Sequence, residues 1–198
     1  MGTKSVSISS KNILTSYLNQ IKKANHAVLG SIYLKREIKL PQKGGIYIFW
    51  WDGKSDLLIK NIINHKHLLK GSRSEKEPVD IRFNQEWIKM ATIANKICLY
   101  VGKSTNLHQR IGKHLKPDTK NIWGAVDFNS GKKPNTESQL RIGIERILKC
   151  KDARQEIFQS ISVTYIELDG TINCVNRFYL EDLIVGTYFP LLNIDIER

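Results

Sequence analysis

The sequence has few cysteines and no long apolar run. Its 198 residues include three isolated cysteines, Cys98, Cys150 and Cys174. No CxxC pair and no Cys/His cluster occurs, which argues against a zinc site and against a disulfide framework. No apolar run approaches the length of a membrane span, and the first twelve residues lack the apolar core of a signal peptide. These absences lead us to expect a cytoplasmic protein without a membrane segment.

Acidic residues are also scarce relative to basic ones. The chain has 19 Asp and Glu against 31 Lys and Arg, a formal net charge of +12. An excess of this size favours a polyanionic partner, usually nucleic acid, although solubility alone is the other explanation. The length and the 41% hydrophobic content predict a single domain, 1–198, with a substantial core.

Apolar patterns predict a mixed α/β (α+β) fold. Three stretches predict strands, at about 45–51, 97–102 and 160–168. The first, GIYIFWW, is apolar throughout, which predicts a strand covered on both faces. Helical periodicity predicts helices at about 9–24, 83–95, 104–116, 137–150 and 174–188. Residues 1–40 therefore form a predicted helical extension, and residues 52–96 a predicted insertion within the core.

The stretch YVGKSTNLHQRIGKHL, residues 100–115, concentrates basic side chains at a strand–turn–helix unit. Ser104 is a candidate helix N-cap. Arg110 and His114 lie one turn apart beside the apolar stripe of the helix, and Lys103 lies at its entrance. Free backbone N–H groups at a helix start favour an anion, so this arrangement suggests a phosphate site. An ordinary basic edge is the alternative.

The helix at 174–188 contains a carboxylate on its apolar face. Glu181 falls between Ile184 and Val185 on a helical wheel, among the apolar positions. An unpartnered carboxylate there would cost several kcal/mol or become protonated. An arginine partner, a metal ion or a catalytic role would each explain it, and a buried salt bridge to Arg110 is the purely structural explanation.

Three separated segments together resemble the GIY-YIG nuclease family. They are GGIY at 44–47, YVGKSTNLHQRIGKH at 100–114 and EDLIVGTYFPLLN at 181–193. Val101 replaces the more common Ile. His114 stands where repair-type members carry Tyr, which resembles the restriction-endonuclease branch. The resemblance implies a small three-stranded antiparallel sheet flanked by helices. It also implies a Mg²⁺-dependent DNA endonuclease, with a type II restriction enzyme favoured.

The resemblance also implies roles for individual side chains. Glu181 would hold one divalent ion per site, Mg²⁺ or Mn²⁺, with water and phosphate oxygens as the other ligands. Arg110 would bind the scissile phosphate. Tyr47 would orient or deprotonate the attacking water, with Lys103 lowering the pKa of the phenol.

Three further residues complete the expected site. His114 is the competing general base, because its unperturbed pKa is suitable. Tyr100 would contribute a hydrogen bond. Asn193 is expected to be structural and to tie the C-terminal tail to the core.

Two alternatives to a restriction enzyme stay open. One is a repair, recombination or homing nuclease, and the other is a catalytically inactive nucleic-acid-binding protein. The expected partner is double-stranded DNA in each nuclease case, and a palindromic target would favour a homodimer.

The insertion at 52–96 is the candidate reader of DNA sequence. Arg, Asn and Gln suit base edges, and Lys suits phosphates. A solvated insertion with ordinary surface charge is the alternative. The candidate DNA-binding side chains are Lys66, Lys70, Arg73, Lys76, Arg82, Asn84 and Gln85.

Overall fold

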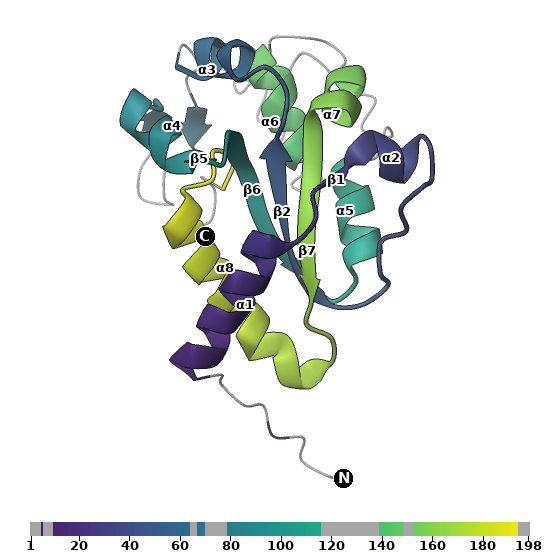
Figure 1. Cartoon of the computed structure of the whole chain (residues 1–198). Coiled ribbons are helices and arrows are strands. Elements are labelled where there is room, and N and C mark those ends of the chain that lie inside the picture. Colours follow the sequence, from purple (N-terminus) through teal and green to yellow (C-terminus); the bar gives the residue numbers. More distant parts are fainter. Residues whose placement is uncertain are drawn as a thin grey trace.

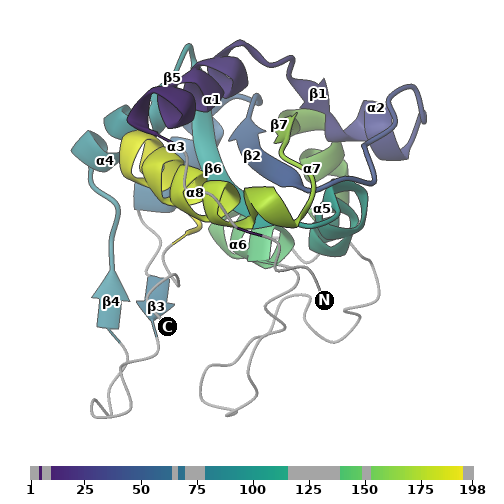
Figure 2. The same cartoon turned by 90° about the horizontal axis from the view of Figure 1, so that it is seen from below.

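The computed structural model describes residue 5 and residues 10–63, 67–69, 79–115, 139–148 and 153–193. These residues form a mixed α+β fold around one five-stranded antiparallel sheet with the strand order β1-β7-β2-β6-β5 (Figure 1). The strands are β1 (Ala27–Val28), β2 (Gly45–Trp51), β5 (Thr92–Ile93), β6 (Lys96–Ser104) and β7 (Ile161–Glu167). A separate antiparallel pair, β3 (His67–Leu69) and β4 (Val79–Ile81), lies apart from this sheet (Figure 2).

Helices cover both faces of the sheet. One face packs against α1 (Lys11–Lys23) and α8 (Cys174–Tyr188). The other packs against α2 (Leu29–Tyr33), α3 (Ser55–Ile63), α4 (Gln85–Ala91), α5 (Leu107–Leu115), α6 (Gln139–Leu148) and α7 (Arg154–Ser160). A short 3₁₀ helix, η3 (Thr171–Asn173), precedes α8. Among the described helices, none combines the length and the apolar character needed to cross a bilayer.

The predicted sheet is incomplete, because five strands are present where three were expected. The three central strands, β2, β6 and β7, lie at the predicted positions. Residues 27–28 pair with β7 and residues 92–93 pair with β6, so each outer edge gains a two-residue strand. Pieces this short show no alternation in the sequence, which is why the pattern misses them. Residues 1–40 consequently contribute a strand as well as helices.

Two predicted helix boundaries are also wrong. The helix expected at 83–95 is only α4, because Ala94 and Asn95 adopt left-handed φ angles of 48° and 64°. Two such residues form the turn that joins β5 to β6. Ser104 is not the N-cap of α5, since β6 continues through it. The cap is Asn106, whose Oδ1 accepts a 2.9 Å hydrogen bond from the Gln109 N–H.

A β-bulge in β6 determines which face carries Tyr100. Phe49 pairs with Tyr100, but the next residue of β2, Trp50, pairs with Cys98. Leu99 is therefore the extra residue, and Leu99 and Tyr100 both join the core on the α5 side. Strict alternation would have turned Tyr100 to the α8 side.

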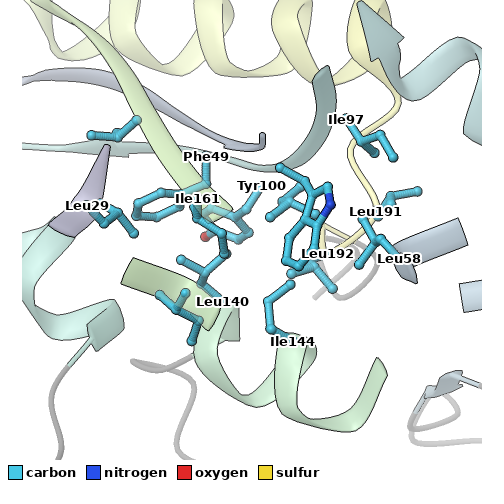
Figure 3. Close-up of a cluster of buried hydrophobic side chains, with 14 of the residues drawn as sticks. Leu29, Phe49, Leu58, Ile97, Tyr100, Leu140, Ile144, Ile161, Leu191 and Leu192 are labelled. Atoms are coloured by element: carbon cyan, nitrogen blue, oxygen red, sulfur yellow. The ribbon is translucent and has the colours of Figure 1, made fainter. Parts of the chain in front are cut away.

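The larger hydrophobic core lies between the sheet and α5, α6 and α7. All seven residues of β2 are buried, as the continuous apolar run predicts. Phe49 and Tyr100 of the sheet face Leu140 and Ile144 of α6 (Figure 3). Burial of each such side chain contributes about 1.5–3 kcal/mol. The position of Tyr100 is consequently fixed by core packing.

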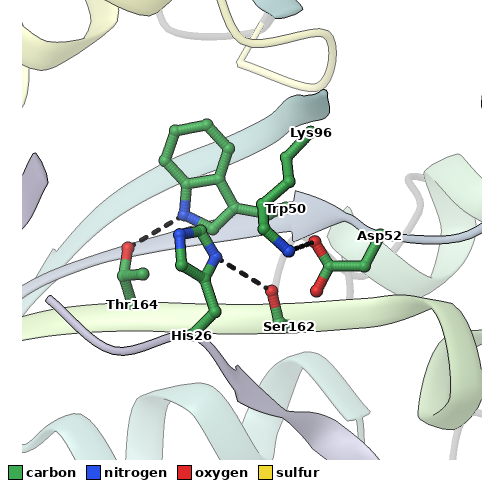
Figure 4. A network of polar contacts seen from close by, with 6 residues as sticks. All are labelled: His26, Trp50, Asp52, Lys96, Ser162 and Thr164. Carbon is green, nitrogen blue, oxygen red and sulfur yellow. Dashed lines mark hydrogen bonds and ion pairs between the residues drawn. The ribbon is translucent and has the colours of Figure 1, made fainter. Parts of the chain in front are cut away.

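The opposite face of the sheet includes a small polar network around Trp50 (Figure 4). The Trp50 indole N–H donates to Thr164 at 2.9 Å, and His26 contacts the Ser162 hydroxyl at 3.2 Å while its ring lies 5.5 Å from that of Trp50. Lys96 and Asp52 form an ion pair at the same end. The fully buried hydroxyls of β7 therefore have partners, as buried polar groups require.

The tail after α8 runs along the outer edge of β6 and forms backbone hydrogen bonds to it. The N–H groups of Leu191 and Leu192 donate to Cys98 and Leu99. The Asn193 side chain accepts from the Val101 N–H at 2.7 Å and donates to the Val101 carbonyl at 2.8 Å. The tie between tail and core that we expected of Asn193 is therefore visible. In the described part of the chain, Lys103 has no backbone partner on this edge.

The two hydrogen bonds of Asn193 predict a measurable loss of stability on truncation. Asn193→Ala should lower the free energy of unfolding by about 1–3 kcal/mol, because both Val101 backbone groups lose their partner. Urea denaturation checks this, with Asn61→Ala as the control. Asn61 makes one exposed side-chain hydrogen bond within α3, so its loss should change stability little. Equal effects of the two changes would contradict the edge-sealing role of Asn193.

Candidate functional site

Four of the predicted site residues meet on the α5 side of the sheet. Tyr47 comes from β2, Tyr100 from β6, and Arg110 and His114 from successive turns of α5. The His114 ring lies 5.7 Å from the Tyr47 ring and 5.0 Å from the Tyr100 ring, and the two phenol rings are 6.2 Å apart. The antiparallel register, with Tyr47 opposite Gly102 and Phe49 opposite Tyr100, brings these side chains together.

The centre of this cluster is a buried hydrogen bond. The Tyr47 hydroxyl lies 2.7 Å from Nε2 of His114, and both side chains have 0% exposure. Burial raises the pKa of Tyr47, Tyr100 raises it further, and Arg110 lowers it in part. Burial, and to a lesser extent Arg110, lowers the pKa of His114 to about 3. At neutral pH the pair is a neutral phenol beside a neutral imidazole.

The other ring nitrogen of His114 completes no hydrogen bond with the described residues. Its Nδ1 atom is buried and has no such partner. When Nε2 accepts the Tyr47 proton, Nδ1 carries the imidazole hydrogen, and a buried unpaired donor costs about 1–3 kcal/mol. Buried polar atoms without a hydrogen-bond partner are rare in folded proteins, and one common reason for them is a role in a functional site.

Gly102 makes room for the two tyrosines. A Cβ at this position would lie 2.4 Å from the Tyr47 hydroxyl oxygen and 2.9 Å from a Tyr100 ring carbon. The sequence pattern identifies Gly102 as a break after the strand, but the residue lies within β6. Gly102 therefore allows the Tyr47 and Tyr100 rings to lie close to the backbone. The sequence pattern does not indicate which rings these are.

Arg110 is the cation that acts on the two phenols. The residue is half-buried, and its guanidinium lowers the pKa of both Tyr47 and Tyr100 against the raising effect of burial. We expected Lys103 to do this for Tyr47, but the groups that shift the pKa of Tyr47 in this structure are Tyr100, Arg110 and Glu181. Lys103 lies two residues beyond Val101 on the strand face opposite Tyr47, where it contacts α8 instead.

Lys103 and Glu181 form an ion pair between β6 and α8. The Glu181 side chain is 16% exposed and that of Lys103 is 38% exposed. The sequence places Glu181 on the apolar face of α8 and offers Arg110 as a salt-bridge partner. An ion pair is indeed present, but its cation is Lys103, because α8 covers the face of the sheet opposite α5.

Phe178 of α8 lies beside this ion pair and is 50% exposed. Its ring centroid is 4.9 Å from the Lys103 ammonium. The buried residues of α8 that face the sheet are Leu180, Ile184 and Tyr188.

The structure describes three of the seven candidate DNA-binding residues in the insertion, Arg82, Asn84 and Gln85. Arg82 and Gln85 are exposed. The Asn84 side chain caps α4 by accepting a 2.8 Å hydrogen bond from the Trp87 N–H, which explains its presence without a DNA contact. The other candidates lie outside the described residues: Lys66, Lys70, Arg73 and Lys76.

A pocket of about 470 Å³ lies elsewhere, between α2 and α5. Its lining consists of Tyr33, His108, Gln109, Gly112 and Lys113. None of these residues belongs to the predicted site. The predicted cluster instead lies on the α5 face of the inner strands β2 and β6, and Tyr47 and His114 within it are fully buried.

The close approach at Gly102 predicts the effect of adding one methyl group. Gly102→Ala should lower the free energy of unfolding by about 1–3 kcal/mol, because overpacking must displace Tyr47 or Tyr100. Gly186→Ala is the control, since a Cβ there meets nothing within 4 Å and helix propensity improves by about 0.5–1 kcal/mol. Thermal and urea unfolding measure both. A neutral Gly102→Ala variant would contradict the crowding.

The buried neutral His114 predicts a pH dependence of stability. The unfolded side chain has a pKa of 6.5 and the folded one about 3, so between these values the unfolded state binds the extra proton. Stability should therefore fall as the pH falls from about 6 to 4, by up to roughly 1.4 kcal/mol per pH unit from this group. His114→Gln should lose that component, and His108→Gln, on the exposed side of α5, should keep it. Identical acid slopes in both variants would contradict this assignment.

The chain was also compared with known proteins. No family model matches it, and neither a curated protein nor a solved structure does so.

Proposed function

We propose that the protein is a Mg²⁺-dependent DNA endonuclease of the GIY-YIG type. The observation that carries the proposal is the convergence of Tyr47, Tyr100, Arg110 and His114 in one cluster. They come from two strands and a helix, in the order that the sequence resemblance implies. The net charge of +12 is a supporting feature, since it favours a polyanionic ligand.

Arg110 is suited to bind the scissile phosphate. Its guanidinium offers paired donors that match two phosphate oxygens, and it is half-buried beside two phenols. Tyr47 is fully buried in the free protein, so a water molecule reaches its hydroxyl only after a covering side chain moves. An Arg110 side chain drawn toward a phosphate would open that path.

Tyr47 and His114 would act together as a proton relay. The hydroxyl of Tyr47 would accept a proton from the attacking water while its own proton passes to Nε2 of His114, 2.7 Å away. Neither group alone is a good base at neutral pH, because burial raises the pKa of Tyr47 and lowers that of His114 to about 3. The two residues are therefore expected to act as one unit, driven by charge developing near Arg110.

Glu181 is the residue that would hold the metal ion. Among the described residues, no group of three or more His, Cys, Asp or Glu side chains could hold one. Support for this choice comes from the Lys103 ammonium, which already pairs with the Glu181 carboxylate. A single carboxylate suits Mg²⁺ because the ion keeps waters and uses phosphate oxygens. A bound Mg²⁺ would polarise the phosphate and stabilise the leaving oxygen.

A type II restriction enzyme is the specific form that we propose. His114 is the residue that separates this branch from repair-type members in the sequence resemblance, and its bond to Tyr47 gives it a chemical task. The segment 52–96 adds α3, α4 and β3–β5 to the central strands, and these additions are the candidate sequence-reading elements.

Cleavage assays with purified protein test the proposal. Wild-type protein should cut plasmid DNA with Mg²⁺ and not with EDTA. Glu181→Gln should reduce the rate at least about 100-fold, since several kcal/mol of charge stabilisation is lost. Arg110→Lys should reduce it about 10²–10³-fold, because the charge remains but the paired donors do not.

The matched control is Glu167→Gln. Glu167 forms a more exposed pair with Lys43 at 2.9 Å, outside the cluster, so this variant should cut at the wild-type rate. Folded Glu181→Gln protein that cuts as fast as Glu167→Gln protein would reject the metal assignment. A wild-type protein that binds DNA without cutting any substrate would favour the inactive DNA-binding alternative.

A further inference from the structure

Glu181 already has a cation beside it, supplied by the protein. The Lys103 ammonium contacts Oε2 of Glu181, and the carboxylate side chain is largely buried at 16% exposure. The ammonium is also 4.9 Å from the centre of the Phe178 ring. One carboxylate and one aromatic ring therefore hold the same lysine.

The three side chains form a compact group. Phe178 and Glu181 are three residues apart on α8, so they lie on neighbouring positions of one helix face. Lys103 reaches them from β6, just beyond the segment sealed by Asn193. The half-exposed Phe178 ring offers its negative face to the ammonium, an arrangement that favours Lys103 staying on Glu181.

A divalent ion at Glu181 would compete with this lysine. Two cations on one carboxylate repel each other, and such repulsion is strong near a low-dielectric interior. The described residues offer no cluster of acidic groups that could compensate. Any metal ion that binds Glu181 therefore gains less than it would from a free carboxylate.

We infer that Lys103 is a displaceable internal cation, held on Glu181 by Phe178, and that metal binding requires it to leave. This inference rests on the proposed metal role of Glu181. Lys103 was expected to lower the pKa of Tyr47. In the present inference it instead lowers the affinity of Glu181 for a metal ion. The free protein would bind divalent metal weakly, and any event that draws Lys103 away would strengthen that binding.

Paramagnetic NMR on the full chain measures this without any cleavage. Mn²⁺ is titrated into ¹⁵N-labelled protein at low ionic strength, and the broadening of amides at 101–104 and 180–182 gives a site-specific dissociation constant. The variants are Lys103→Met, Lys103→Arg, Phe178→Leu and the double variant Lys103→Met/Phe178→Leu. Lys43→Met is the control, since it removes one positive charge from a more exposed pair with Glu167.

The expected order of affinities is specific. Lys103→Met should bind Mn²⁺ at least about fivefold more tightly than Lys43→Met, and Lys103→Arg should resemble the wild type. Phe178→Leu should bind about two- to fivefold more tightly than the wild type. Phe178→Leu should add nothing in the Lys103→Met background, because the ring then has no ammonium to hold. Glu181→Gln in that background should abolish the local broadening.

Two results would overturn the inference. One is equal Mn²⁺ affinity in Lys103→Met and Lys43→Met, and the other is no broadening near Glu181 even without Lys103. Tighter Mn²⁺ binding by Lys103→Met together with a wild type that never cuts DNA would support the internal cation and reject the nuclease. Wild-type protein that cuts DNA, together with no gain in Mn²⁺ affinity in Lys103→Met, would support the nuclease and reject the internal cation.

Discussion

The site depends on the close approach of the Tyr47 hydroxyl to the backbone of Gly102. Any side chain at this position would displace the phenol that contacts His114. The bulge at Leu99 then puts Tyr100 on the same face, and the register of β2 against β6 holds both rings under α5. Strand pairing and core packing therefore determine the geometry of the site. Its polar side chains are held in place by strands and a helix that the hydrophobic core already makes rigid.

The end of β6 lies close to both candidate sites, one on each face of the sheet. Residues 191–193 cover this edge as far as Val101, and Lys103 lies beyond the covered part. The cluster around Tyr47 belongs to the α5 face, and the pair of Lys103 and Glu181 belongs to the α8 face. A phosphate at the end of β6 could meet Arg110 from one face and the carboxylate site from the other, which is the physical basis of the proposed function.

The sequence predicts the parts of this structure that rest on local periodicity. The strand GIYIFWW and the helix Cys174–Tyr188 lie where the pattern indicates. The sequence pattern does not predict β1 and β5, because a two-residue strand is too short to show alternation. It does not predict the bulge either, because strand pairing depends on a distant strand. The partner of Glu181 could not be predicted from the sequence for the same reason. A helical wheel places the carboxylate on a face, but only the tertiary fold decides whether Arg110 or Lys103 reaches it.

The central claim is that Tyr47 and His114 act as one proton-accepting unit. Single-turnover cleavage by Tyr47→Phe, His114→Gln and the double variant tests it most directly. A shared relay predicts that the double variant is no slower than the slower single variant, because either change already breaks the relay. Rate losses that multiply in the double variant would show independent roles and contradict the account.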